Sequence, residues 1–151
     1  MRISIVIPTY NEEKELPNLF AALKAQTFQD FEVIVSDNHS TDGTRAIAEK
    51  FGARIVDGGN PSVGRNNGAH AAKNDIIIFF DADVVPQPDF IEKALKEFEE
   101  RGLDVASADN LPISDLRRDK IFYEAANKYF HLVENIFPHA TGTFIITKKD
   151  I

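Results

Sequence analysis

Two aspartates separated by one residue follow the most apolar run of the sequence. Asp81, Ala82 and Asp83 come directly after Ile76–Phe80, which has the length and composition of a buried strand. In extended backbone, residues two apart point to the same side, so the two carboxylates would lie together and repel each other. Such oxygen ligands suit Mg²⁺ or Mn²⁺ held jointly with a diphosphate. The alternative is that one aspartate caps the turn before Pro86 and the other is solvated; the position after a buried strand favours the metal.

A second group of polar residues follows the first apolar run of the chain. Pro8–Glu12 contains an aromatic ring and small polar groups. Tyr10 could stack on a nucleobase, and Thr9 could form a hydrogen bond with the same base. The alternative is a helix entry in which Tyr10 packs on its own loop and Asn11 is the cap.

A dense polar segment, Ser36–Thr44, follows the second apolar run. Helix capping by Ser40, Thr41 and Asp42 explains part of this segment. Capping does not explain Asp37 and Asn38, and the Asp37 carboxylate could accept the imide proton of uracil or the N1 and N2 protons of guanine. The segment therefore supplies a candidate base ligand.

Arg65 lies between two glycines in the first turns of a predicted helix. Gly64 and Gly68 each cost roughly 1 kcal/mol in a helix relative to alanine. We expect that something approaches the backbone closely at these glycines, and that Arg65 reaches a diphosphate or a base edge. The alternative is a solvated arginine on an exposed helix face.

Strand-like and helical segments alternate along the whole chain. The predicted strands are Arg2–Pro8, Phe31–Val35, Arg54–Val56, Ile76–Phe80, Leu103–Ala108 and Thr143–Thr147. The predicted helices contain Leu16–Leu23, a segment from Ser40 or Thr41 to Phe51, Pro61–Ala72 with Asn60 as cap, Phe90–Phe98 and Arg117–Ile136, the last with Ile121, Ala125, Leu132 and Ile136 facing inward. This alternation predicts an α/β fold with a mostly parallel sheet and helices on both faces, in which ligands bind at the carboxyl ends of the strands.

The amino-acid composition limits the kinds of partner that the protein can bind. The 151 residues suit a single domain, 1–151, and 17 basic against 24 acidic residues give a net charge of -7, which argues against nucleic acid. There is no cysteine, no apolar run of the roughly 20 residues that a membrane helix needs, and no signal segment. We expect a cytoplasmic protein, or one held at the cytoplasmic face of a membrane through parts of a parent protein outside this chain.

Taken together and in this order, the motifs resemble family 2 of the glycosyltransferases. The resemblance is carried by Ser4–Glu12, Gln26–Phe28, Phe31–Asp37, Ser40–Thr44, Gly64–Gly68 and Phe80–Asp83. It implies the GT-A fold, a three-layer sandwich, and metal-dependent transfer of a sugar, with inversion, from a UDP- or GDP-sugar to an acceptor hydroxyl or lipid phosphate.

The resemblance also implies roles for individual residues. Thr9, Tyr10 and Asp37 would contact the base, Arg65 the nucleotide and Asp81 the ribose. Asp83 would bind Mn²⁺ or Mg²⁺ and the diphosphate, with Asp81 as a secondary metal ligand. The predicted nucleotide-sugar-binding residues are Pro8, Thr9, Tyr10, Glu12, Asp37, Arg65, Asp81, Ala82 and Asp83.

The sequence departs from the family pattern at two places. Ser36-Asp37 stands where many members have two acids, which leaves the base, uracil or guanine, open. The carboxylate that activates the acceptor lies in the family after the last predicted strand, so we expect the general base beyond Ile151 and the domain to be truncated on its acceptor side. The acceptor class, a glycan, a lipid phosphate or another hydroxyl, is open as well.

Two other classes of function fit part of the pattern. An apolar strand followed by Asp81-Ala82-Asp83 is also the first motif of haloacid-dehalogenase-type phosphatases, with Asp81 as nucleophile and Asp83 as acid-base. In that class, however, the motif opens the fold, whereas several elements precede it here. The remaining alternative is a module that binds a nucleotide sugar without catalysis.

Overall fold

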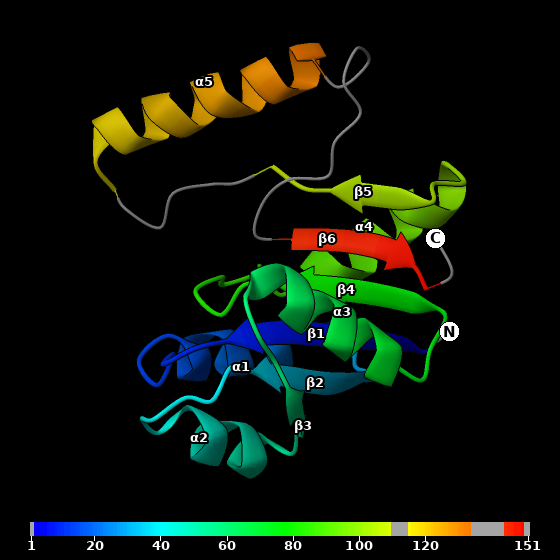
Figure 1. Cartoon of the computed structure of the whole chain (residues 1–151). Helices are drawn as coiled ribbons and strands as arrows, with labels where there is room; N and C mark the ends of the chain where they lie inside the picture. Colours follow the sequence, from blue (N-terminus) through cyan, green and yellow to red (C-terminus); the bar gives the residue numbers. More distant parts are fainter. Residues whose placement is uncertain (1, 110–114, 134–143, 150–151) are drawn as a thin grey trace.

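The computed structural model describes residues 2–109, 115–133 and 144–149 (Figure 1). The strands are β1 (Ile3–Thr9), β2 (Phe31–Asp37), β3 (Arg54–Asp57), β4 (Ile76–Phe80), β5 (Val105–Ser107) and β6 (Phe144–Lys148). The helices are α1 (Leu16–Lys24), α2 (Thr44–Phe51), α3 (Pro61–Ala71), α4 (Phe90–Glu100) and α5 (Arg117–Val133). The predicted alternation of strands and helices is confirmed. No helix in the described ranges is both long and apolar enough to cross a bilayer.

The strands form one sheet in the order β3-β2-β1-β4-β6-β5. The first four strands pair in parallel, and β6 runs antiparallel to both of its neighbours, β4 and β5. The chain reverses its direction across the sheet after β3, when it returns past β1 to form β4. In parallel sheets, ligands bind beside such a reversal, at the carboxyl ends of the strands.

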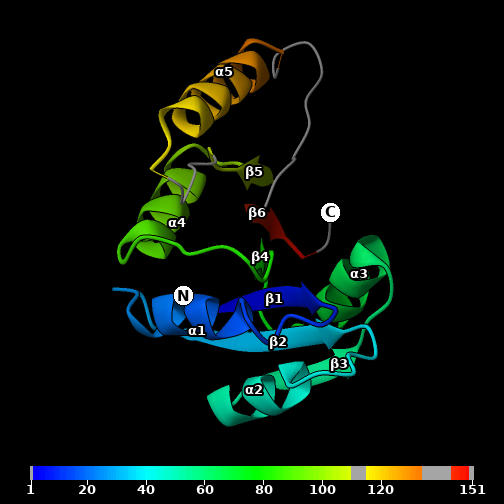
Figure 2. The same cartoon turned by 90° about the vertical axis from the view of Figure 1, so that its left-hand side faces the viewer.

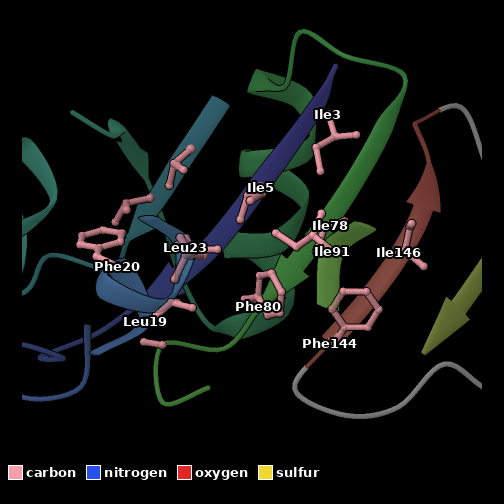
Figure 3. Close-up of a cluster of buried hydrophobic side chains, with 14 of the residues drawn as sticks. Ile3, Ile5, Leu19, Phe20, Leu23, Ile78, Phe80, Ile91, Phe144 and Ile146 are labelled. Atoms are coloured by element: carbon pink, nitrogen blue, oxygen red, sulfur yellow. The ribbon is translucent and has the colours of Figure 1, made fainter. Parts of the chain in front are cut away.

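Helices cover both faces of the sheet. On one face, α1, α2 and α4 contribute buried side chains to a core with β1, β2, β4 and β6, and ten residues of this core are labelled in Figure 3. On the other face, α3 packs over Val6, Ile34 and Ile77, and Figure 2 shows α3 on the side opposite to α1 and α4. The predicted three-layer arrangement is therefore confirmed.

The central strand β1 is buried on both faces. Ile3, Ile5 and Ile7 belong to the larger core and Val6 to the smaller one, and all four are fully buried. Burying each such side chain contributes roughly 1.5–3 kcal/mol. This burial stabilises the position of β1 in the sheet. Because β1 pairs with β4, the residues that follow the two strands have fixed relative positions.

Helix α5 was predicted to face inward, and this prediction is wrong for two of its residues. Ile121 is 55% exposed and Ala125 is also exposed. The reason is that α5 lies beyond the edge strand β5 rather than over a face of the sheet (Figures 1 and 2). The other two residues of that prediction, Leu132 and Ile136, lie outside the described side chains.

The starts of α2 and α3 differ in how well sequence signals located them. The Asn60 side chain accepts a hydrogen bond from the Val63 N–H, as predicted for the cap of α3. Helix α2 begins only at Thr44, with Gly43 in the cap position. Ser40 and Thr41 therefore do not cap α2, because their polar groups are used between loops, as described below.

The two glycines of α3 are explained by packing against β1. A Cβ atom at position 68 would overlap Cγ1 of Val6, and one at position 64 would lie 3.3 Å from Cβ of Pro8. The expected close approach to the backbone is real, but the approaching group is a strand and not a ligand. Close packing of α3 on β1 brings the intervening Arg65 toward the end of the sheet.

Candidate functional site

A cavity of about 670 Å³ opens at the carboxyl ends of the central strands. It is lined by Pro8, Thr9, Tyr10, Glu12, Glu15, Asn38, Gly59, Pro61, Arg65, Asp81, Ala82 and Asp83. Every predicted binding residue except Asp37 is among them. Asn38 was predicted only as a polar residue at a strand end that capping does not explain. Glu15, Gly59 and Pro61 were not predicted to bind a ligand, although the last two follow a predicted strand, whose carboxyl end was the available signal.

Arg65 and the aspartate pair form the charged part of the cavity. Arg65 Nη2 donates a hydrogen bond to Asp81 Oδ1 at 2.6 Å, and the two side chains are 26% and 34% exposed. Burial raises the pKa of Asp81, and neighbouring Asp83 adds to this, although the Arg65 guanidinium opposes the rise. Asp83 is exposed, and no hydrogen bond within the described part of the chain engages its carboxylate. Asp83 is therefore the freer of the two carboxylates for an external cation.

Negative charge predominates around the cavity. Burial raises the pKa of Glu12, and the carboxylates of Asp83, Glu15, Asp42 and Asp81 raise it further. Among the described residues that line the cavity, Arg65 is the only positively charged one. A diphosphate entering here would meet net repulsion unless a cation accompanied it.

The carboxylates fit a hard divalent cation, but they form an incomplete set of ligands. Asp81 and Asp83 offer the oxygen donors that Mg²⁺ and Mn²⁺ prefer. The described residues contain no group of three or more acidic, histidine or cysteine side chains arranged to hold a metal. A metal at Asp83 would therefore draw its further ligands from water and from the bound molecule.

Hydrogen bonds join the loop that carries Tyr10 to the loop before α2. The Tyr10 side chain is 59% exposed and lines the cavity. The next residue, Asn11, has a φ of 57° and donates its N–H to Ser40 Oγ, while its side chain accepts from the Thr41 N–H at 2.9 Å. Asn11 is thus not a helix cap, and the ring of Tyr10 is presented from a loop with a fixed backbone.

Asp37 lies within the sheet and not in the turn where the sequence argument placed it. Strand β2 extends two residues further than predicted, so that Asp37 pairs with Thr9 on one side and Asp57 on the other. Its carboxylate is fully buried and accepts bonds from Thr9 Oγ1, Ser40 Oγ, Ser40 N–H and Arg45 Nη1. Burial alone would raise the pKa of Asp37, but these donors outweigh it and hold the pKa below its ordinary value.

Comparisons with known proteins identify the family of this chain. The family model described as glycosyl transferase family 2 matches residues 4–149. Since this match includes nearly the whole sequence, the chain belongs to that family, whose named relatives are glycosyltransferases. The expected GT-A fold is confirmed by the structural neighbours described below.

Two relatives illustrate the similarity in sequence. An uncharacterized glycosyltransferase, YfnE, of Bacillus subtilis (strain 168) is 37% identical over 107 residues, which is 66% of this chain and 27% of the relative. Undecaprenyl-phosphate 4-deoxy-4-formamido-L-arabinose transferase of Pseudomonas fluorescens (strain Pf0-1) is 37% identical over 131 residues, 77% of this chain and 38% of the relative. The chain thus matches well under half the length of either relative.

Two solved structures illustrate the similarity in fold. S. aureus TarS 1-349 in complex with UDP-GlcNAc has a TM-score of 0.63 and 27% identity, over 76% of this chain and 37% of that one. The mannosyltransferase PcManGT from Pyrobaculum calidifontis, in complex with GDP-Man and Mn²⁺, has a TM-score of 0.73 and 21% identity, over 97% and 44% of the two chains. The second likeness shows the fold alone.

Proposed function

We propose that this protein takes part in the metal-dependent transfer of a sugar, with inversion, from a UDP- or GDP-linked donor bound in the cavity. The observation that carries the proposal is the convergence of Arg65, Asp81, Asp83 and Tyr10 at the carboxyl ends of the strands. Solved structures of related fold contain UDP-GlcNAc in one case and GDP-Man with Mn²⁺ in another, which supports both the donor class and the metal.

Each residue has a distinct part in donor binding. Tyr10 stacks on the base with its exposed ring. Arg65 contacts the nucleotide while it holds Asp81, which approaches the ribose. Asp83 is the main ligand of Mn²⁺ or Mg²⁺, with Asp81 secondary. When bound, the metal neutralises charge on the departing diphosphate.

The acceptor side of the reaction requires a general base. A general base takes the proton of an acceptor hydroxyl, which then attacks the anomeric carbon opposite the diphosphate. The proposed base lies beyond Ile151, and the acceptor is a glycan, another hydroxyl compound or a lipid phosphate. One relative is named an undecaprenyl-phosphate 4-deoxy-4-formamido-L-arabinose transferase, which supports the lipid phosphate.

Thermal unfolding against UDP, GDP, CDP and ADP, each with and without Mn²⁺, tests the donor proposal. A ligand at 100 times its dissociation constant adds roughly 2.7 kcal/mol to the free energy of unfolding. We expect a stabilisation that requires both a diphosphate and the metal. Stabilisation by a diphosphate without any effect of Mn²⁺ would contradict the metal assignment, and no stabilisation at all would contradict the donor site.

A haloacid-dehalogenase-type phosphatase would use the same residues for a different reaction. There Asp81 would attack phosphorus, yet Asp81 is ion-paired with Arg65 and follows the fourth strand of the chain. Membership of the glycosyltransferase family supports the transferase instead. Stoichiometric binding of beryllium fluoride to Asp81 would be the result that favours the phosphatase.

A further inference from the structure

The Gln26–Phe28 motif carries part of the family resemblance, yet none of its residues is among those that line the cavity. Gln26 lies just after α1, and it is only 4% exposed. Its Nε2 donates to the carbonyl oxygens of Ala22 and Gln87, at 3.3 and 2.7 Å, and its Oε1 accepts from the Ile91 N–H at 3.0 Å. Both donors and the acceptor of this buried amide are therefore used, and two of the three bonds reach the region that follows β4.

One of these bonds caps α4 from outside that helix. The first turn of a helix leaves main-chain N–H groups without partners within the helix. Asp89 occupies the N-cap position of α4, but its carboxylate pairs with Lys93 instead of capping the helix. The Ile91 N–H donates to Gln26 instead. The start of α4 is therefore held by a residue at the end of α1, a helix on the same face of the sheet (Figure 2).

Thr27 adds two further bonds to the same region. Its N–H donates to the carbonyl oxygen of Pro88 at 2.7 Å, and its hydroxyl donates to Glu92 Oε2 at 2.6 Å. Within the described ranges, every hydrogen bond between residues 84–89 and the chain before β4 comes from Gln26 or Thr27. These two residues therefore hold the loop that leads from the aspartate pair to α4.

The position of Asp83 depends on the main chain on either side of it. Its carboxylate is exposed and makes no hydrogen bond to any residue that the structure describes, so no side-chain contact fixes it. Before Asp83, the chain is held by β4 and by the buried Ala82. After Asp83, Val84 and Pro86 pack inward, and the bonds from Gln26 follow directly. Gln26 is therefore part of what sets the direction in which the chain leaves the aspartate pair.

We propose that Gln26 is a positioning residue for the metal site, which holds the loop after β4 so that Asp83 stays at the cavity beside Asp81. The inference rests on the proposed function, because it requires a divalent cation bound by Asp83 together with a nucleoside diphosphate. Gln26 itself contacts neither of them. Mg²⁺ and Mn²⁺ bind carboxylate oxygens within a narrow range of distance and direction, so a loosened loop should lower the affinity for the cation.

Binding of Mn²⁺ to the protein in the presence of excess UDP tests this inference. Electron paramagnetic resonance measures free Mn²⁺, and a blank of UDP without protein corrects for the Mn²⁺ that the nucleotide holds. The titration is made at a temperature where every variant is folded. Gln26→Leu keeps a buried side chain of similar size but removes three hydrogen bonds, and its affinity for Mn²⁺ should fall at least about fivefold.

Gln29→Leu is the matched control, because it makes the same substitution three residues further on. The three hydrogen bonds of the Gln29 side chain go to the carbonyl oxygens of residues 23, 24 and 26, and not to the loop after β4. This variant should have a lower melting temperature and an unchanged affinity for Mn²⁺. A role of Gln26 in stability alone would likewise move only the melting temperature.

Thr27→Val is a milder variant for the case that Gln26→Leu does not fold. It removes the hydroxyl bond to Glu92 and keeps the main-chain bond to Pro88. Its loss of Mn²⁺ affinity should be smaller than that of Gln26→Leu, but larger than that of Gln29→Leu.

The inference is overturned if Gln26→Leu binds Mn²⁺ as tightly as the wild type, or if Gln29→Leu loses as much affinity as the Gln26 and Thr27 variants. Either result, with a wild-type protein that binds Mn²⁺ together with UDP, would leave the proposed function intact. A wild-type protein that binds no Mn²⁺ beyond the UDP blank overturns the proposed function and this inference together.

Discussion

Arg65 and Asp81 meet across the cavity from different elements, with Nη2 of the arginine 2.6 Å from Oδ1 of the aspartate. Arg65 comes from α3 and Asp81 from the end of β4, so the pair links a helix on one face of the sheet to the edge where the cavity opens. Partly exposed pairs of this kind contribute roughly 0–1 kcal/mol. The main consequence is therefore orientation, since the pair holds Asp81 and leaves Asp83 exposed.

Replacing Arg65 should weaken donor binding more than it weakens the fold. In Arg65→Gln the only cation lining the cavity within the described residues is lost, so the affinity for UDP with Mn²⁺ should fall at least about tenfold. Arg65→Lys should recover only part of it, because a lysine cannot reproduce the planar, forked donors. Isothermal titration calorimetry measures both. Arg101→Gln, which removes an exposed arginine directly after the last residue of α4, is the matched control, and an equal loss there would contradict the assignment.

Replacing Asp83 should remove the effect of the metal. In Asp83→Asn the Mn²⁺-dependent stabilisation by UDP should disappear, while the melting temperature without ligand stays close to that of the wild type, because the side chain is exposed. Thermal unfolding with and without Mn²⁺ measures it. Asp75→Asn, an exposed aspartate before β4 at the opposite end of that strand, should leave the metal response unchanged. Persistence of the full metal response in Asp83→Asn would show that the cation binds elsewhere.

The ring of Tyr10, rather than its hydroxyl, should carry the contact with the base. Tyr10→Phe should bind UDP about as well as the wild type, and Tyr10→Ala should lose roughly 1–3 kcal/mol of binding free energy. Because the side chain is 59% exposed, neither change should lower the melting temperature appreciably. Equal losses in both variants would mean that the hydroxyl, and not stacking, makes the contact.

Packing of α3 on β1 should be sensitive to one methyl group. Gly68→Ala places a Cβ where Cγ1 of Val6 lies, and the shift needed to relieve the overlap should cost about 1–3 kcal/mol. Asn66→Ala, on the exposed side of the same helix, should leave the stability unchanged or raise it. Urea unfolding of both variants measures the difference. A Gly68→Ala protein of wild-type stability would show that α3 can move off the strand without cost.

A half-buried carboxylate, Glu32, near the amino ends of the strands should make stability depend on pH. Burial alone would raise the pKa of Glu32, but the Lys73 N–H, the Ser4 hydroxyl and Arg54 hold it below its ordinary value. Its contribution is therefore present above the unfolded-state pKa of about 4.3, and is lost as the pH falls through the lower folded-state pKa.

Glu32→Gln tests this dependence. The variant should lose roughly 1–3 kcal/mol of unfolding free energy at pH 7, and the difference from the wild type should shrink toward pH 3. Urea unfolding at the two pH values measures it. Glu49→Gln, an exposed carboxylate on α2, is the control and should show neither effect. A difference in unfolding free energy that grows toward low pH would contradict the predicted direction of the pH dependence.

Much of the fold followed from local patterns. Ile76–Phe80 was identified as a strand because a run of that length and apolarity has few alternatives, and Asn60-Pro61 located the start of α3. The parallel core of the sheet followed from the alternation of strands and helices. The antiparallel direction of β6 and the position of α5 did not follow, since both depend on where the chain returns to the sheet.

The candidate site, like the fold, was predicted in part from local sequence patterns and in part only from the tertiary structure. The sequence by itself determined which polar residues follow strands, because strand ends are local features, and Thr9, Tyr10, Asp81 and Asp83 do meet at one cavity. It did not distinguish Asp37 from Asn38, although the two are adjacent. That distinction depends on pairing with Thr9 and on donors from Ser40 and Arg45, contacts that exist only once β1, β2 and α2 are assembled. The tertiary structure decided which of two adjacent side chains is buried and which lines the cavity, because Asp37 is the last residue of β2 and pairs with both neighbouring strands, whereas Asn38 lies just beyond the strand.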